Sequence, residues 1–137
     1  MEVNGKKKTH YKGLIGELEF TLHLLKIGWN VFSPIDQNSR TDLVAEKEGS
    51  FKKIQIKFCT PYKGCLRVDL EHPGRSTDPY SEKEVDEIGL FDPLHNKFYL
   101  VPLKDILPRK EIWLRVDSLA KNKKQEKNIH WAFKYEI

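Results

Sequence analysis

The segment KIQIKFC, residues 53–59, decides the fold prediction because its apolar and polar side chains alternate as they do in a β-strand. The two faces of this strand carry Ile54, Ile56 and Phe58 on one side and Gln55, Lys57 and Cys59 on the other. A lysine on a covered face of a sheet loses its water and needs a negative partner. The strand therefore predicts a carboxylate, a metal site or a phosphate close to Lys57.

The sequence around this strand predicts one helix followed by a strand-rich body. Residues 11–27 show a helical pattern, with Thr9 as a possible N-cap and Gly28 ending the helix. Residues 41–50 form a strand and a turn, and this strand makes a hairpin with the 53–59 strand. Residues 65–70 are expected to add a third antiparallel strand. The remaining predicted strands are WNVFSP (29–34), VDEIGLF (85–91), KFYLVPL (97–103), EIWLRV (111–116) and IHWAFKYEI (129–137).

This order predicts an α/β fold in which an N-terminal helix packs on a central mixed β-sheet, with extra C-terminal strands. A chain of 137 residues fits a single domain, 1–137, with residues 1–10 loose and residues 71–84 a long loop. The three tryptophans fall in strand patterns and are expected in the core.

The composition limits the partners, the metal sites and the location that can be expected for this protein. A net charge of +4 allows a phosphate-bearing partner without requiring one. Cys59 and Cys65 are expected to be a reduced pair, and no second Cys/His pair with zinc-ligand spacing is present. Without a secretory leader or an apolar run of membrane-spanning length, a cytoplasmic protein with no membrane partner is expected.

Glu17 is the first candidate site residue. At about 100° per residue it falls between Leu14 and Phe20, inside the wide apolar arc of the predicted helix, whereas Gly16 and His23 lie on the opposite side. A carboxylate there must be paired, bind a cation or stand at the rim of a cleft. Taken alone, a rim glutamate or one neutralised by a core lysine is the favoured explanation.

The position of Asp42 favours a shared site over an isolated rim glutamate. It opens the strand TDLVAE, and the hairpin register can bring it beside Gln55 and Lys57. Hydrolysis of a phosphodiester uses a divalent cation, and Mg²⁺ prefers oxygen ligands. Glu17, Asp42 and the Gln55 carbonyl can supply these oxygens, while Lys57 can assist the attacking water or stabilise the developing charge. The sequence thus predicts one site with four catalytic residues, three of them ligands of Mg²⁺ or Mn²⁺.

The order of Glu17, Asp42 and Gln55-Ile56-Lys57 resembles the PD-(D/E)XK nuclease superfamily. Within it, the chain is similar to the branch of group I intron-encoded homing endonucleases over roughly residues 12–102. The similar segments are KGLIGELEF, TDLVAE, IQIKF, TPYKGCLRVDL, YSEKEVDEIGLF and KFYLVP. Archaeal Holliday junction resolvases are similar over the front half only. The resemblance implies a metal-dependent endonuclease acting on double-stranded or branched DNA.

Further expectations concern turnover, oligomeric state and contacts with DNA. The usual acid two residues before the lysine is Gln55 here, as in that branch, so the alternative is a non-catalytic DNA-binding module that retains the fold. A nuclease this small usually cuts two strands by pairing, which predicts a homodimer or homotetramer. The residues expected to contact DNA are Lys12, Lys63, Arg67, Arg75 and Lys83. Tyr80, Glu84 and Asp86 match the downstream part of the branch pattern and are expected to pack under the site.

Overall fold

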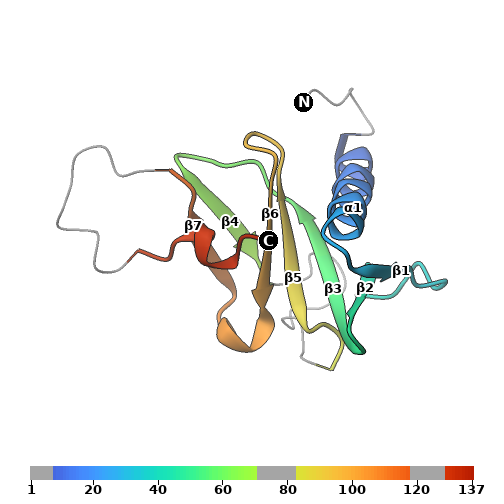
Figure 1. Ribbon diagram of the computed structural model, residues 1–137. Helices are drawn as coiled ribbons and strands as arrows, with labels where there is room; N and C mark the ends of the chain where they lie inside the picture. Colours follow the sequence, from blue (N-terminus) through green and yellow to red (C-terminus); the bar gives the residue numbers. More distant parts are fainter. Residues whose placement is uncertain (1–7, 71–82, 118–128) are drawn as a thin grey trace.

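One long helix covers one face of a five-stranded sheet, and a two-stranded sheet covers the other face (Figure 1). The computed structural model describes residues 8–70, 83–117 and 129–137. The helical elements are α1 (Lys8–Lys26), η2 (Leu103–Asp105) and η4 (Ala132–Tyr135). The strands are β1 (Asn30–Phe32), β2 (Leu43–Lys47), β3 (Ser50–Phe58), β4 (Cys65–Asp69), β5 (Glu87–Asp92), β6 (Lys97–Pro102) and β7 (Glu111–Arg115).

The larger sheet has the order β1-β2-β3-β5-β6 and is mixed. The predicted hairpin of β2 and β3 is present, with Leu43 opposite Ile54. On the other side of β3, β5 runs parallel to it, and β6 then runs antiparallel to β5. The α/β prediction, with an N-terminal helix on a central mixed sheet, is therefore confirmed.

Two strand predictions are wrong. Residues 65–70 do not extend the hairpin, because β4 pairs with β7 in a separate sheet. The place beside β3 belongs to β5, whose six residues are all buried and therefore suit a central strand better than the alternating β4 does. The C-terminal segment contains the short 3-10 helix η4 instead of a full strand.

The five-stranded sheet separates two apolar clusters. Phe20 and Leu24 of α1 pack on one face against Ile54, Ile56 and Phe91. The other face packs against β4 and β7, and this second cluster includes Cys59, Leu66, Ile88, Leu90 and Leu114. Lys57 and Gln55 share the parity of Cys59 along β3, so both project from the side that β4 and β7 cover.

Only part of the predicted apolar arc of the helix faces the sheet, together with Gly16 and His23, which were predicted on the opposite side. Gly16, Phe20 and Leu24 are its buried residues, and a Cβ on Gly16 would lie 3.4 Å from the Cβ of Phe58. His23 stacks on a phenylalanine of β6 with ring centroids 4.1 Å apart. The helix has two apolar sides, and the small Gly16 lets its axis approach β3 on one of them. Thr9 lies inside α1, so it is no N-cap.

Other expectations have mixed outcomes. Cys59 and Cys65 are both free, as expected. Trp113 is 45% exposed beneath the guanidinium of Arg67, so its placement in the core is wrong. Trp29 packs half-buried against the helix-side cluster. In the described part of the chain, no helix is long and apolar enough to cross a membrane.

Candidate active site

Asp42 occupies a fixed position where β2 begins. Its backbone N–H donates to the carbonyl of Ile54 over 2.9 Å, which continues the hairpin register by one residue. Its side-chain Oδ2 accepts a hydrogen bond of 2.8 Å from the backbone N–H of Ile56. Two bonds to β3 thus orient this carboxylate at the edge of the hairpin.

The segment before β5 is hydrogen-bonded to the residue before Asp42 and to β3. The buried hydroxyl of Thr41 donates to the carbonyl of Glu84 over 2.7 Å, and Asp86 Oδ2 accepts from the backbone N–H of Lys53 over 2.8 Å. Glu84 and Asp86 were expected to pack under the site, and these bonds tie them to the hairpin beside it. Tyr80 lies outside the described residues.

Glu17 points from α1 toward this carboxylate, and the two side chains share a hydrogen bond. Burial raises the pKa of Glu17. Burial also raises the pKa of Asp42, to about 6, and the nearby charge of Glu17 adds to this effect while the Ile56 amide opposes it. Ionisation of the Glu17 carboxyl group therefore disfavours ionisation of Asp42, and a proton or a cation would stabilise the pair.

Lys57 lies on β3, near Asp42, and is half-buried. Burial lowers the pKa of its ammonium group, whereas the charges of Asp69 and then Asp42 raise it. The alternation of β3 predicts a negative partner for Lys57, and the structure has two: Asp42 in the hairpin and Asp69 on β4. Asp69 was missed by the sequence analysis, since nothing in the spacing indicates that β4 lies over this face of β3.

Gln55 is half-buried two residues before Lys57 on β3, in the register position opposite Asp42. Two carboxylates and one amide carbonyl are hard oxygen donors of the kind that Mg²⁺ or Mn²⁺ prefers. The raised pKa values of Glu17 and Asp42 fit such a cation, because it would relieve their mutual repulsion. In residues 8–70, 83–117 and 129–137, no three His, Cys, Asp or Glu side chains form a metal-binding group.

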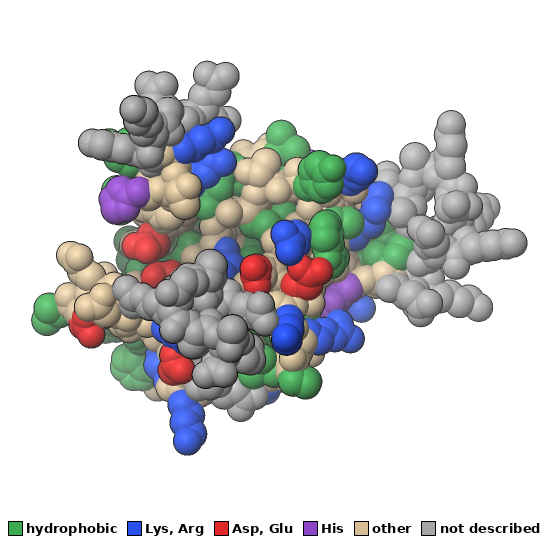
Figure 2. All heavy atoms as spheres, turned by 180° about the vertical axis from the view of Figure 1, so that it is seen from behind, with side chains coloured by type: hydrophobic (Ala, Val, Ile, Leu, Met, Phe, Trp, Pro, Cys, Tyr) green, Lys and Arg blue, Asp and Glu red, His purple; other side chains and the backbone are tan. Residues whose placement is uncertain are grey.

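The predicted DNA-contacting residues have different surroundings. Lys12 lies 5.6 Å from the ring centroid of Phe58, at the end of the strand that carries Lys57. Arg67 forms an ion pair of 2.8 Å with Glu111. Arg75 lies outside the described residues. Lys63 is exposed in a left-handed turn, and Lys83 is exposed with its carbonyl accepting from Lys53. Acidic and basic side chains alternate on the face in Figure 2.

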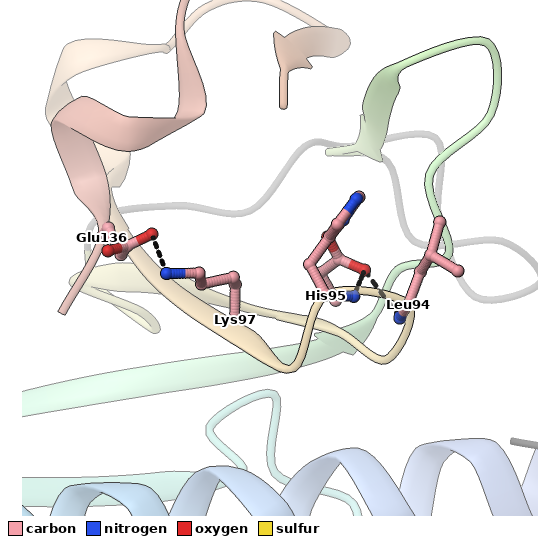
Figure 3. A network of polar contacts seen from close by, with 5 residues as sticks. Leu94, His95, Lys97 and Glu136 are labelled. Atoms are coloured by element: carbon pink, nitrogen blue, oxygen red, sulfur yellow. Dashed lines mark hydrogen bonds and ion pairs between the residues drawn. The ribbon is translucent and has the colours of Figure 1, made fainter. Parts of the chain in front are cut away.

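A second group of polar residues, in the β5–β6 turn, has a structural role. The fully buried Asp92 accepts hydrogen bonds from the backbone N–H of Leu94 and from His95 Nδ1, at 2.9 and 2.6 Å. Lys97 at the start of β6 pairs with Glu136 (Figure 3). These contacts stabilise the turn and hold the C-terminal segment against the sheet.

An acid-bearing helix, packed on a mixed sheet whose hairpin carries an acid and a lysine, defines a restriction-endonuclease-like α/β protein. The chain belongs to the PD-(D/E)XK endonuclease family, whose profile matches residues 7–137. A solved bacterial homing endonuclease, I-Ssp6803I, is similar with a TM-score of 0.74 and 26% sequence identity, over 96% of this chain and 89% of that chain. No curated protein sequence matches the chain. The family membership makes this protein a nuclease by class and confirms the resemblance seen in its motifs.

Proposed function

We propose that this protein is a divalent-cation-dependent endonuclease that hydrolyses phosphodiester bonds in DNA. The observation that carries the proposal is that Asp42, oriented by the Ile56 amide, lies close to both the Glu17 carboxyl group of α1 and the Lys57 ammonium group of β3. Such a cluster costs stability unless a proton or a cation relieves it. A nuclease needs a cation site beside a positively charged group, and this cluster supplies both.

Each residue then has a separate part in the reaction. Glu17, Asp42 and the Gln55 carbonyl would hold Mg²⁺ or Mn²⁺, which when bound supplies a Lewis acid for the phosphoryl oxygens and an acidified water. Lys57 donates a hydrogen bond to the attacking water or to a phosphoryl oxygen, and its partial burial strengthens this interaction. Asp69 keeps Lys57 protonated.

The substrate is proposed to be double-stranded or branched DNA. I-Ssp6803I is a homing endonuclease, and its likeness to almost the whole of this chain favours a site-directed cut over a junction-resolving one. Lys12, Lys63, Arg67 and Lys83 are proposed to contact phosphates, since charge contacts of this kind position a duplex. A homodimer or homotetramer acting in the cytoplasm would cut both strands.

A plasmid-nicking assay with matched glutamates tests this proposal. Glu17→Gln removes the helix carboxylate of the site, whereas Glu19→Gln makes the same change two residues along α1, where no site residue lies. In Mg²⁺, wild type and Glu19→Gln should nick supercoiled plasmid, and Glu17→Gln and Lys57→Ala should lose about 100-fold or more of the rate. Equal nicking by Glu17→Gln and Glu19→Gln would refute the site.

The rival function is a DNA-binding module without turnover, and the neutral Gln55 favours it because the site then has only two carboxylates. Mobility-shift assays beside the nicking assay separate the two functions. Binding by all variants with no nicking in Mg²⁺ or Mn²⁺ supports the module. Binding by all variants, with nicking by wild type and Glu19→Gln only, supports the enzyme.

A further inference from the structure

The outer face of α1 carries a row of large apolar side chains that no described element covers. Figure 1 shows α1 at the side of the molecule, with the five-stranded sheet on its inner side only. The row consists of Tyr11, Leu14, Leu18, Leu22 and Leu25, which are 39%, 45%, 61%, 48% and 53% exposed. Scattered exposed leucines are ordinary, but a contiguous row marks an interaction site.

These five side chains form one narrow stripe, here called the leucine stripe. At about 100° per residue they span an arc of roughly 80°, which is centred nearly opposite the buried Phe20. Polar residues separate the two apolar sides, with Lys12 and Glu19 on one flank and His10 and Thr21 on the other. One apolar side of α1 therefore packs on the sheet of its own chain, and the second apolar side is exposed to a further partner.

The segments outside the described residues have few large apolar side chains in their sequence. Apart from two prolines, residues 1–7, 71–82 and 118–128 contain Met1, Val3, Tyr80 and Leu119. The stripe itself offers roughly 500 Å² of surface on each copy, so two copies would bury up to about 1,000 Å², which lies at the lower limit for a specific interface between proteins. A second copy of the chain brings a matching apolar row of the same length.

We propose that α1 pairs antiparallel with α1 of a second copy, about a twofold axis at Leu18. The spacing of the stripe is symmetric about this residue, so the axis brings each apolar residue onto another. Leu18 then meets Leu18 of the other copy, Leu14 meets Leu22, and Tyr11 meets Leu25. This is the self-complementarity that an isologous twofold interface requires, and the interval of three and four residues suits side-chain packing between helices.

This interface goes beyond the proposed function, because none of its residues belongs to the candidate site. It would join two molecules through the same helix that carries Glu17, and so put two sites in one particle. Self-association can be measured without DNA or metal, so a failure of this interface would leave the proposed catalytic site untouched. Loss of nicking in a protein that still dimerises would contradict the proposed nuclease and leave the interface in place.

The first experiment measures the mass of the full chain in solution by light scattering or sedimentation at tens of micromolar. Wild type should have twice the mass of the 16.1 kDa chain. Leu18→Glu places two like charges at the axis and should give a monomer with an unchanged circular dichroism spectrum, because Leu18 is exposed within each copy. The control is Leu94→Glu in the β5–β6 turn, where a leucine is 67% exposed away from α1.

A pair of double variants tests the antiparallel register and guards against a folding defect. Leu14→Glu with Leu22→Lys puts opposite charges together across the proposed axis, whereas Leu14→Glu with Leu22→Glu puts like charges together. The first double variant should dimerise at least tenfold more tightly than the second. A parallel pair would instead oppose like charges in both.

Each outcome either supports or overturns the proposed interface. A dimer in wild type and Leu94→Glu, a monomer in Leu18→Glu, and rescue only by the glutamate–lysine pair support the interface. A monomeric wild type, a dimer that survives Leu18→Glu, equal behaviour of the two double variants, or binding of the stripe to lipid vesicles in place of a second copy would each overturn it.

Discussion

The carboxyl groups of Glu17 and Asp42 share a hydrogen bond although they come from α1 and from the start of β2. A hydrogen bond between two acids requires a proton on one of them, and burial favours a protonated form by raising the pKa of both groups. Gly16 lets α1 approach β3 closely, and the Ile56 amide orients Asp42. The backbone therefore brings together two negative groups that would otherwise separate, and most of the expected behaviour of the site follows from this pair.

A divalent cation is expected to stabilise the protein at pH 7.5, where the pair has lost its shared proton and the cation would neutralise the two carboxylates. Mg²⁺ or Mn²⁺ should raise the melting temperature of wild type by a few degrees, because a ligand of the folded state stabilises it by mass action. Asp42→Asn should lose this shift. Gln55→Glu should reach it at about tenfold lower cation concentration, since it restores a negative ligand. Matched ionic strength in KCl is the control, and equal shifts in the three proteins would contradict the assignment of ligands.

The stability of the metal-free protein should fall as the pH rises from about 4 to about 6. The pKa of Asp42 is about 6 when folded against 3.8 for its ordinary value, so the folded state binds more protons in this window. One pKa unit is about 1.4 kcal/mol, and the loss should amount to about 1–3 kcal/mol and level off above pH 6. Chemical unfolding in EDTA measures it.

Asp42→Asn supplies the comparison for this pH dependence. An asparagine side-chain oxygen can still accept from the Ile56 amide but has no titrating carboxyl group. The variant should therefore lack most of the decline and be the more stable protein at pH 7. Parallel stability curves for wild type and Asp42→Asn would show that Asp42 does not carry the shift.

Asp69 is expected to position the charge of Lys57 without touching the substrate. Its negative charge raises the pKa of Lys57 against the effect of burial. Asp69→Asn should therefore move the alkaline limb of the pH–rate profile to lower pH, with a smaller loss of rate at pH 7 than Lys57→Ala. Asp105→Asn, at an exposed position in η2, is the matched control. An unmoved alkaline limb in Asp69→Asn would remove this role.

The hairpin site could be predicted from the sequence because strand alternation and a short turn fix its register. Once Glu48 and Gly49 make the turn between β2 and β3, the period of two brings Asp42, Gln55 and Lys57 together. Local rules were sufficient here. The placement of Glu17 beside Asp42 was also predicted, although the direction of the helix that carries it was not.

Two of the wrong predictions, the side of the helix that faces the sheet and the partner of β3, concern choices between equivalent local patterns. The helix has two apolar sides, and periodicity alone cannot show which of them the sheet covers. The turn between Cys59 and Cys65 would suit a third hairpin strand equally well, but β5 takes that place by a parallel crossover. The contribution of Asp69 was missed for the same reason, since it depends on β4 leaving the sheet and crossing its face.

Two glycine substitutions should have opposite effects on stability. Gly89 lies in β5 opposite Ile56, where a Cβ would come within 2.7 Å of the Ile56 Cδ1 and 3.0 Å of the Phe20 Cζ. Gly89→Ala therefore crowds the contact between α1 and the sheet and should lower the free energy of unfolding by about 1–3 kcal/mol. Gly13 lies in α1 with nothing within 4 Å of an added Cβ, so Gly13→Ala should raise it by about 0.5–1 kcal/mol.

Urea unfolding followed by circular dichroism measures both glycine variants under one set of conditions. Because the crowding at Gly89 acts on the helix that carries Glu17, Gly89→Ala should also weaken cation-induced stabilisation, whereas Gly13→Ala should leave it unchanged. This second readout separates a shift of α1 from a general loss of stability. If Gly89→Ala is as stable as wild type, the close packing of α1 on β5 does not position the site.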